Sequence, residues 1–214
     1  MNITIIGAGN MGRGIGTRAV AGGHSVTFID RDPAEAEKAA TEVKASAKNG
    51  AKVSTASLGE AELGDVVVFA VWYGTNIELA KQLGDKLTGK IVVDIANPLN
   101  ETYDGLATAP DSSSAEDLAR AIANGAKVVK AFNTTYAGTL LAGQVADQPL
   151  DVFIAGDDEG AKAKVAQIVT DGGMRPVDAG PLNRARQIEG MQLLHIVTQG
   201  TLGTNWGSAL KILG

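Results

Sequence analysis

The residues best suited to bind a ligand lie within the first thirty positions of the chain. Gly7, Gly9 and Gly12 form a Gly-x-Gly-x-x-Gly motif directly after an apolar stretch, residues 3–6. A second apolar stretch ends in Asp30, eighteen positions after Gly12. That distance is close to the roughly 20 residues that separate such a loop from a ribose-binding acid. The pattern predicts a dinucleotide site between a strand and a helix.

Each glycine of this motif has its own physical role. Gly7 allows a tight turn, Gly9 lets the main chain approach a pyrophosphate, and Gly12 permits close packing of helix against strand. The free amides and the positive dipole end of the helix would then hold the phosphates through main-chain contacts. The expected phosphate-binding set is Gly7, Ala8, Gly9, Asn10, Met11 and Gly12.

Composition narrows the class of protein. The chain has 214 residues, of which 44% are hydrophobic and 27 are glycine, as in α/β proteins with many tight turns. Its net charge of −5 argues against nucleic acid or an anionic membrane as a partner. The absence of cysteine excludes disulfides, thiolate metal sites and thiol catalysis, and we expect no metal site. No apolar run approaches the ~20 residues of a membrane span and no basic leader precedes residue 2, so we expect a cytoplasmic protein.

The apolar runs alternate with helix-period segments, which predicts an α/β fold of the Rossmann type with a doubly wound, mostly parallel sheet. We expect a dinucleotide-binding domain over residues 1–182 and a small C-terminal helical extension over residues 183–214 that closes the site. The predicted strands cover residues 2–6, 25–30, 65–71, 90–95, 127–132, 151–155 and 174–178.

An acidic trio at residues 157–159 precedes a helical pattern that Gly172 and Gly173 end. Acids at a helix start complement the helix dipole, so we interpret the trio as an N-terminal cap. The alternative is a metal site, but no histidine or further acid is placed to complete a hard-cation shell.

The segment from Asn183 to Gln199 is helix-like and carries apolar residues around most of its circumference. One face cannot bury all of them, so the helix is expected to lie between its own domain and a second body. A symmetric second subunit is the simplest candidate, and we expect a homodimer.

Ligands of an open α/β sheet bind outside the carboxyl ends of its strands. The segments that follow three of the predicted strands supply amides, hydroxyls and aromatic surface, but no acid, base or imidazole. The segment after the strand at residues 65–71 carries an aromatic pair, Trp72 and Tyr73. These side chains either shield a flat ring or only cover the end of the sheet. The longest candidate loop, residues 97–114, either covers a site or is a surface excursion. The candidate residues of these segments are Val71, Trp72, Tyr73, Asn97, Pro98, Asn133 and Thr134.

No residue is predicted to take part in the chemistry itself. His24 is expected to be structural, and His195, within an apolar helix, is expected to be a buried, hydrogen-bonded imidazole. No Ser-His-Asp set, metal-spaced histidine pair or obvious lysine base is present. A hydride that moves between two bound aromatic cofactors needs alignment at roughly 3 to 3.5 Å more than it needs a protein acid. A dehydrogenase of hydroxy acids or sugars would need a group to take the hydroxyl proton.

Several segments resemble a known family, the NADPH-dependent reductases of the deazaflavin coenzyme F420, whose fold is similar to the reductase domain of six-transmembrane metalloreductases. The resemblance implies a dinucleotide on the glycine loop. It also implies that a deazaflavin stacks near the nicotinamide, between Asn97, Pro98, Asn133, Thr134 and residues 203–207. The segments that carry it are residues 6–12, 93–99, 130–134, 155–158 and 175–182.

The chain departs from this family where the dinucleotide's ribose would bind. The family commonly has serine or threonine before an arginine, whereas this chain has Asp30 and Arg31, and Glu35 where a lysine can assist. The Asp30 carboxylate would accept ribose hydroxyls and repel a 2′-phosphate, which favours NAD(H). Arg31 would pair with a 2′-phosphate or stack on adenine, so NADP(H) and NAD(H) both stay open. The C-terminal tail also differs, with Thr204-Asn205-Trp206 in the second-cofactor region.

The leading hypothesis is therefore an oxidoreductase that transfers a hydride between NAD(P)H and a flat acceptor such as F420. One alternative is a reductase of a small carbonyl or imine, with Tyr73, Tyr136 or Asp178 as proton donor. A second alternative is that the enzyme is a flavin or ferric reductase. From a different class, the chain would be a redox sensor that binds NAD(P)(H) and passes its redox state through the dimer helix. All these readings have a small-molecule partner.

Overall fold

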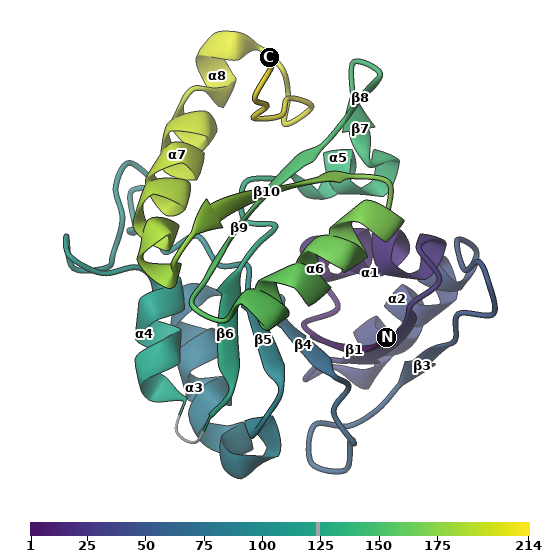
Figure 1. Cartoon of the computed structure of the whole chain (residues 1–214). Helices are drawn as coiled ribbons and strands as arrows, with labels where there is room; N and C mark the ends of the chain where they lie inside the picture. The colour runs from purple at the N-terminus through teal and green to yellow at the C-terminus, as the bar shows by residue number, and fades with distance from the viewer. Residues whose placement is uncertain (123–124) are drawn as a thin grey trace.

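The computed structural model describes residues 1–122 and 125–214. An eight-stranded sheet in the order β10-β9-β6-β5-β4-β1-β2-β3 runs through the molecule (Figure 1). Its strands are β1 (Asn2–Ile6), β2 (Ser25–Ile29), β3 (Val53–Thr55), β4 (Val66–Phe69), β5 (Ile91–Asp94), β6 (Lys127–Lys130), β9 (Asp151–Gly156) and β10 (Arg175–Gly180).

The first six strands of this sheet are parallel, in the register Ile3 beside Val26 and Val66, and Val92 beside Val128. β9 pairs antiparallel with β6, and β10 pairs parallel with β9. The predicted doubly wound, mostly parallel sheet is therefore confirmed. The chain order reverses between β1 and β4, which places a crevice for ligands at their carboxyl ends.

Helices cover both faces of the sheet because successive strand residues point to opposite sides. Ile3 and Ile5 pack in one core with α1, α2, α5 and α6, and Val67 and Phe69 pack in the other with α3 and α4 (Figure 1). The helices are α1 (Asn10–Ala21), α2 (Pro33–Lys44), α3 (Tyr73–Leu83), η1 (Gly84–Leu87), α4 (Ser114–Ala121), α5 (Ala137–Ala142), α6 (Glu159–Asp171), η2 (Leu182–Arg184), α7 (Ala185–Val197) and α8 (Gln199–Leu202).

Two short features have no counterpart among the predicted strands. β3 lies at the sheet edge, half-buried or exposed, and β7 (Gln144–Val145) pairs with β8 (Gln148–Pro149) in a small hairpin. Neither carries the continuous apolar run by which buried strands are recognised. In the described part of the chain, no helix has both the length and the apolar character needed to cross a membrane.

The acidic trio has the predicted capping role. The Asp158 side chain accepts the amide of Ala161 at 2.8 Å as the N-cap of α6, which ends at Gly172. Glu159 pairs with Lys162 at 2.9 Å, and Asp157 accepts the amide of Leu182 at 2.9 Å. Each acid is therefore used within the fold.

The C-terminal helical segment differs from its prediction in two ways. It is divided into η2, α7 and α8 rather than forming one helix. Its inward face carries polar residues, among them Glu189, Gln192 and His195, whereas Leu194 and Val197 are 63% and 48% exposed. Apolar contact is present on the inner face as predicted, since Ile188 is 3% exposed and packs with Phe153. The polar side chains beside it, which were not expected there, are satisfied by buried polar partners described below.

Candidate active site

The glycine loop between β1 and α1 has the predicted geometry. Gly7 adopts φ +106°, and a Cβ there would lie 2.3 Å from the carbonyl oxygen of Ala70. A Cβ on Gly12 would lie 2.0 Å from the carbonyl oxygen of Gly7, so helix and loop touch at this point. Over Gly9 a Cβ would meet nothing within 4 Å, which leaves open space in front of the loop. The space over Gly9 is therefore open at the point where a pyrophosphate would approach the main chain.

The first turn of α1 is left available to an anion. Gly9 is its N-cap and supplies no side-chain oxygen, and no acid occupies the first turn. The amides at this end of a helix have no intrahelical partners, and the helix dipole makes the end positive. Asn10 and Met11, the first two residues of the helix, present these amides.

Asp30 lies where β2 ends, beside the glycine loop. Its Oδ2 accepts the amide of Ala8 at 2.7 Å, and its Oδ1 accepts the amide of Asp32 at 3.0 Å. Arg31 is exposed. The structure therefore brings the predicted ribose-binding acid and the glycine loop together through a direct hydrogen bond.

A pair of amide side chains joins the ends of β5 and β6. Asn97 donates to the carbonyl oxygen of Asn133 at 2.9 Å, and Asn133 Nδ2 donates to Asn97 Oδ1 at 3.0 Å. Pro98 and Thr134 are buried beside this pair. The Thr134 hydroxyl is buried without a hydrogen-bond partner in the described residues. Sequence positions that were predicted separately are thus assembled at one edge of the sheet.

A pocket of about 230 Å³ opens at the end of β4. Trp72, Tyr73 and Asn97 line it together with the loop after β5, including the exposed Glu101. That loop runs from β5 to α4 and forms one wall of the pocket. This agrees with the hypothesis that residues 97–114 cover a site. Val71, which directly precedes Trp72, lies near the glycine loop, since a Cβ on Gly7 would lie 3.1 Å from Val71 Cγ1.

The Tyr73 hydroxyl is not free within this pocket. It donates to Asp117 of α4 at 2.5 Å. Burial and the Asp117 carboxylate raise the pKa of Tyr73 to about 12. The phenol is therefore neutral at ordinary pH and already hydrogen-bonded.

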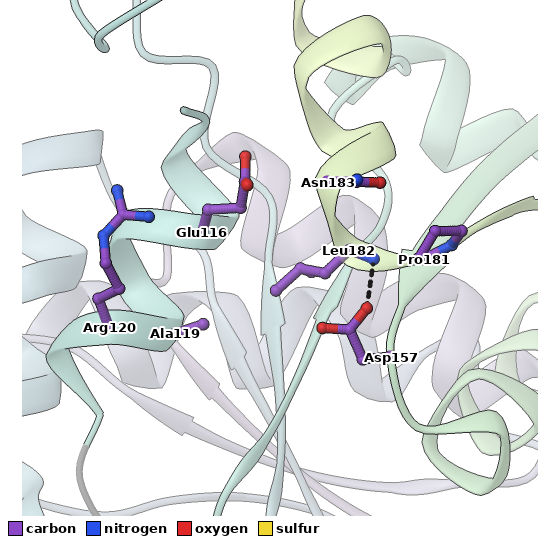
Figure 2. Close-up of a pocket in the computed structure, with 7 residues that line it drawn as sticks. All are labelled: Glu116, Ala119, Arg120, Asp157, Pro181, Leu182 and Asn183. Atoms are coloured by element: carbon purple, nitrogen blue, oxygen red, sulfur yellow. Dashed lines mark hydrogen bonds between the residues drawn. The ribbon is translucent and has the colours of Figure 1, made fainter. Parts of the chain in front are cut away.

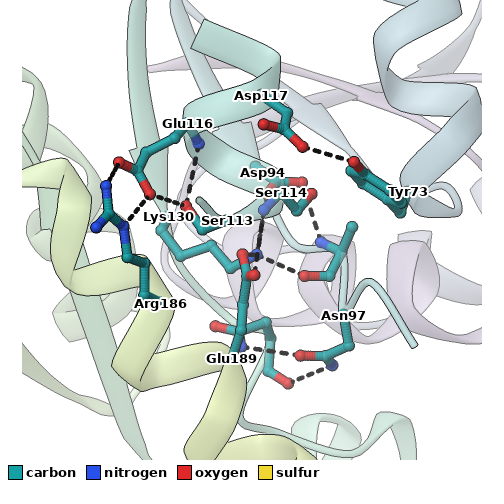
Figure 3. A network of polar contacts seen from close by, with 12 residues as sticks. Tyr73, Asp94, Asn97, Ser113, Ser114, Glu116, Asp117, Lys130, Arg186 and Glu189 are labelled. Carbon is teal, nitrogen blue, oxygen red and sulfur yellow. Dashed lines mark hydrogen bonds and ion pairs between the residues drawn. The ribbon is translucent and has the colours of Figure 1, made fainter. Parts of the chain in front are cut away.

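Beneath the amide pair lies a fully buried charged cluster (Figure 3). Lys130 Nζ lies 2.9 Å from Asp94 Oδ2 and 2.7 Å from Glu189 Oε1. Burial disfavours the Lys130 ammonium, but the two carboxylates outweigh it and raise its pKa, so the lysine stays charged. Burial raises the pKa of Glu189, against the opposing effect of Lys130.

This charged cluster holds the backbone that leads into the site. Lys130 donates to the carbonyl oxygen of Ala96, and Asp94 Oδ1 accepts the Ala96 amide at 3.1 Å. Glu189 accepts the Ser114 amide at 3.1 Å, which ties α7 to the start of α4. The main chain of Ala96, directly before Asn97, is therefore held at both its amide and its carbonyl. Figure 3 shows Lys130 between the carboxylates of Asp94 and Glu189.

A second polar cluster joins the C-terminal tail to α7. His195 Nε2 lies 2.7 Å from the Ser208 hydroxyl, and its Nδ1 lies 3.2 Å from Gln192. The Tyr136 ring stacks at 4.7 Å against His195 and meets Trp206 edge-on at 5.2 Å. Burial lowers the pKa of His195, so the imidazole is neutral. The predicted structural role of His195 agrees with these contacts.

Comparisons with known proteins show which family the chain resembles. A family model described as NADP oxidoreductase coenzyme F420-dependent matches residues 2–98. The F420-dependent NADP reductase of Methanocaldococcus jannaschii is 32% identical over 208 residues, which cover 92% of this chain and 91% of that protein. The chain belongs to the family of F420-dependent NADP oxidoreductases. It is accordingly an oxidoreductase with a Rossmann-type fold.

Two further relatives of this oxidoreductase extend the comparison. The crystal structure of a putative F420-dependent NADP-reductase from Arthrobacter sp. FB24 superposes with a TM-score of 0.84 at 30% identity and covers 99% of both chains. Metalloreductase STEAP3 of Rattus norvegicus is 32% identical over 194 residues, which are 89% of this chain but 36% of STEAP3. The family resemblance predicted from the sequence motifs is confirmed.

The charged cluster of Lys130, Asp94 and Glu189 was not predicted from the sequence. A signal was present, because Asp94 and Lys130 each interrupt a continuous apolar strand that must be buried on both faces. Glu189 had no such signal, since an acid within a helix is usually a solvated surface residue.

A second pocket, of about 320 Å³, lies between α4 and η2 (Figure 2). Glu116 and Arg120 of α4 face Leu182 and Asn183 across it, and Asp157 is bound to the Leu182 amide (Figure 2). It contains no residue of the glycine loop or of the amide pair. The predicted site residues therefore gather elsewhere.

The tail that carries Trp206 is anchored at its far end by Asp151. This buried carboxylate pairs with Arg175 and with Lys211 at 2.9 Å, and accepts the Ile212 amide at 2.9 Å. Burial opposes the charged form, but these partners lower the pKa of Asp151 to about 2. An acid with a lowered pKa stabilises the fold fully above its unfolded value, and the stabilisation is lost as the pH falls through the folded value. The anchor should therefore hold above pH ~4.

We expect Asp151→Asn to release the tail at pH 7, because the neutral amide cannot pair with both cations. Limited proteolysis between residues 203 and 214 should become faster, and the fluorescence of Trp206 should shift in a Trp72→Phe background. Asp147→Asn, an exposed acid in the nearby hairpin, serves as the control and should change neither. Unchanged proteolysis of Asp151→Asn would contradict the anchoring role.

Proposed function

We propose that the protein transfers a hydride between a nicotinamide dinucleotide on the glycine loop and the deazaflavin F420 beside it. The observation that carries the proposal is the pocket of Trp72, Tyr73 and Asn97, which opens at the end of β4, the strand that pairs with β1 and ends beside Gly7 of the glycine loop. Its aromatic and amide lining suits a flat heteroaromatic ring. The name of the M. jannaschii relative and the family description point to the same pair of substrates.

The residues present fit both groups. Open space over Gly9 and the uncapped amides of α1 suit a pyrophosphate, which supports the proposed cofactor set Gly7, Ala8, Gly9, Asn10, Met11 and Gly12 with Asp30 and Arg31. For the nicotinamide and the acceptor we propose Val71, Trp72, Tyr73, Asn97, Pro98, Asn133 and Thr134. The unpartnered Thr134 hydroxyl and the paired amides supply hydrogen bonds to a ring edge.

In this mechanism the protein orients its two substrates rather than donating a proton to them. When bound, the dinucleotide and the deazaflavin supply the hydride donor and acceptor, and a proton is exchanged with solvent. Asn97 and Asn133 hold one another, so their carbonyl and amide groups face the site in one orientation. The charged cluster fixes the Ala96 peptide and thereby the position of Asn97. Such fixed alignment is what hydride transfer requires.

Two of the three proton donors of the carbonyl or imine reductase alternative, Tyr73 and Asp178, are engaged elsewhere. Tyr73 is bonded to Asp117. Tyr136 is half-buried, burial raises its pKa to about 12, and its hydroxyl has no hydrogen-bond partner among the described residues. Asp178 pairs with Lys162 at 3.0 Å. Although burial opposes it, the Gly180 amide and Lys162 lower the pKa of Asp178, so it is ionised and has no proton to give. These contacts favour the hydride-transfer proposal.

The direct test is an anaerobic titration of the protein with NADH and with NADPH, each in the presence and absence of F420. We expect equal amounts of dinucleotide oxidised and F420 reduced. Dinucleotide binding without any reduction of F420 would overturn the proposed acceptor. Parallel cuvettes with flavin, ferric citrate or a cyclic imine would then identify which of the other reactions occurs.

Replacing Asn97 tests the amide pair. We expect Asn97→Ala to lower kcat/KM for F420 by roughly tenfold, because Asn133 loses its partner and the acceptor loses a fixed edge. The Kd of the dinucleotide should change less than kcat/KM, because its pyrophosphate and ribose are held by the glycine loop and Asp30. Asn183→Ala, an exposed amide in the other pocket, is the matched control. Equal kinetics for the two variants would remove Asn97 from the site.

We also propose that α7 and α8 of the C-terminal extension, residues 183–214, form the contact of a homodimer. Their outer surface exposes Leu194, Val197 and Leu202 at 63%, 48% and 56%. Exposed apolar side chains that gather on adjoining helices are typical of an interface between subunits.

The predicted cytoplasmic location stays a prediction.

Leu194→Asp should convert the dimer to a monomer in sedimentation velocity at micromolar concentration, because an unpaired carboxylate would be buried in the contact. Leu141→Asp on α5 is the control, since Leu141 is 51% exposed and lies on a helix outside the proposed contact of α7 and α8. A wild-type monomer, or a dimer that persists in Leu194→Asp, would contradict this arrangement.

A further inference from the structure

The residues at the end of β2 indicate how this chain would bind the adenosine ribose of its dinucleotide. The two oxygens of the Asp30 carboxylate accept the amides of Ala8 and Asp32. A carboxylate has about four acceptor positions, so about two remain after these bonds. They suit the two hydroxyls of a ribose diol, and the two amides prevent the carboxylate from turning away.

The nearby cations do not offset the negative charge of Asp30. Arg13 of α1 is held by Glu35 of α2, and its Nε lies 3.6 Å from Glu42. Its guanidinium is therefore already neutralised by carboxylates. The segment that follows β2 has three other charged residues. Asp30 and Asp32 carry two negative charges, and Arg31 carries one positive charge.

The N-terminus of α2 does not supply an anion site either. Asp32 is its N-cap and accepts the amide of Ala34 at 3.0 Å, and Pro33 at the first position has no amide hydrogen. Glu35 adds a carboxylate in the first turn. The end of the helix that would attract a 2′-phosphate is thus already occupied by acids.

We infer that Asp30 selects NAD(H) over NADP(H), so that this chain differs in its dinucleotide from the family description. The inference rests on the proposed function only in that a dinucleotide occupies the glycine loop. A 2′-phosphate carries nearly two negative charges and would lie against the fixed Asp30 carboxylate. Arg31 is exposed, so in this arrangement its guanidinium would contact the adenine or solvent instead of forming a phosphate clamp.

Binding of NADH and NADPH to the purified protein, measured by nicotinamide fluorescence without any acceptor, tests the inference. We expect NADH to bind at least about tenfold more tightly than NADPH at low ionic strength. The ratio should fall as salt is raised, because the discrimination is electrostatic. A preference for NADPH would overturn the inference and leave the hydride-transfer proposal intact, whereas binding of neither would overturn both.

Variants separate the roles of the charged residues. Asp30→Ser and the isosteric Asp30→Asn should each weaken NADH, strengthen NADPH and bring the two dissociation constants within about threefold. Glu37→Gln removes one negative charge from an exposed position of α2 and should leave the ratio as in wild type. Arg31→Ala should change both affinities by the same factor. A selective loss of NADPH in Arg31→Ala, or an unchanged ratio in both Asp30 variants, would overturn the assignment.

Discussion

Lys130→Met is expected to lower the free energy of unfolding by about 3–5 kcal/mol, because it leaves buried carboxylates without their cation. Asp94 and Glu189 have fully buried side chains and both lie within 3 Å of the Lys130 ammonium. Urea denaturation followed by circular dichroism measures the change. The loss should also release the Ala96 peptide and α7, so hydrogen exchange should rise over residues 95–99 and 185–197.

Lys127 provides the matched control for this variant. It lies on the same strand and pairs with Asp158 at 2.8 Å, but its side chain is 46% exposed. Lys127→Met should therefore cost less than about 1 kcal/mol. Adding Glu189→Gln to Lys130→Met should recover part of the loss, since one uncompensated charge disappears. Equal destabilisation by the two lysine variants would show that the charged cluster does not hold the fold.

Gly9→Ala is expected to weaken dinucleotide binding by about a hundredfold, roughly 3 kcal/mol, while the melting temperature changes little. An alanine Cβ at this position meets no atom of the described residues within 4 Å, so the fold can accept it. The same Cβ occupies the space through which the pyrophosphate approaches the amides of α1. Titration of NADH or NADPH, with thermal unfolding measured in parallel, checks both parts.

Gly12→Ala distinguishes binding from folding at the same loop. Its Cβ would lie 2.0 Å from the Gly7 carbonyl oxygen, which is fixed main chain. We therefore expect a loss of roughly 3 kcal/mol in stability together with the loss of binding. Wild-type dinucleotide affinity in Gly9→Ala would show that the pyrophosphate does not bind at this loop.

Most of the fold could be predicted because its signals are local. The runs at residues 65–71 and 90–95 are continuous and apolar, as parallel strands covered on both faces must be, and they became β4 and β5. β3 has only three residues and no buried side chain in its pattern, so no periodicity marked it. The strand direction of β9, antiparallel to β6, depends on the long-range path of the chain rather than on its residues.

The candidate site was predictable in part. The segments after β4, β5 and β6 were expected to converge because the carboxyl ends of parallel strands share one edge, and Asn97 and Asn133 do meet there. Their reciprocal hydrogen bonds, the Tyr73 bond to Asp117 and the wall formed by Glu101 depend on side-chain geometry that residue type does not determine.

The sequence by itself determined the glycine loop, the alternation of strands and helices, and the family. These rest on residue types within a few positions of each other, where backbone conformation and apolar periodicity act directly. Only the tertiary structure decided that Glu189 meets Ser114, 75 positions away, and that Lys130 joins it to Asp94. It also decided that α7 buries its polar face and exposes Leu194. A buried charge is stable only beside its partner, and that partner is brought there by packing between distant elements, which no local pattern records.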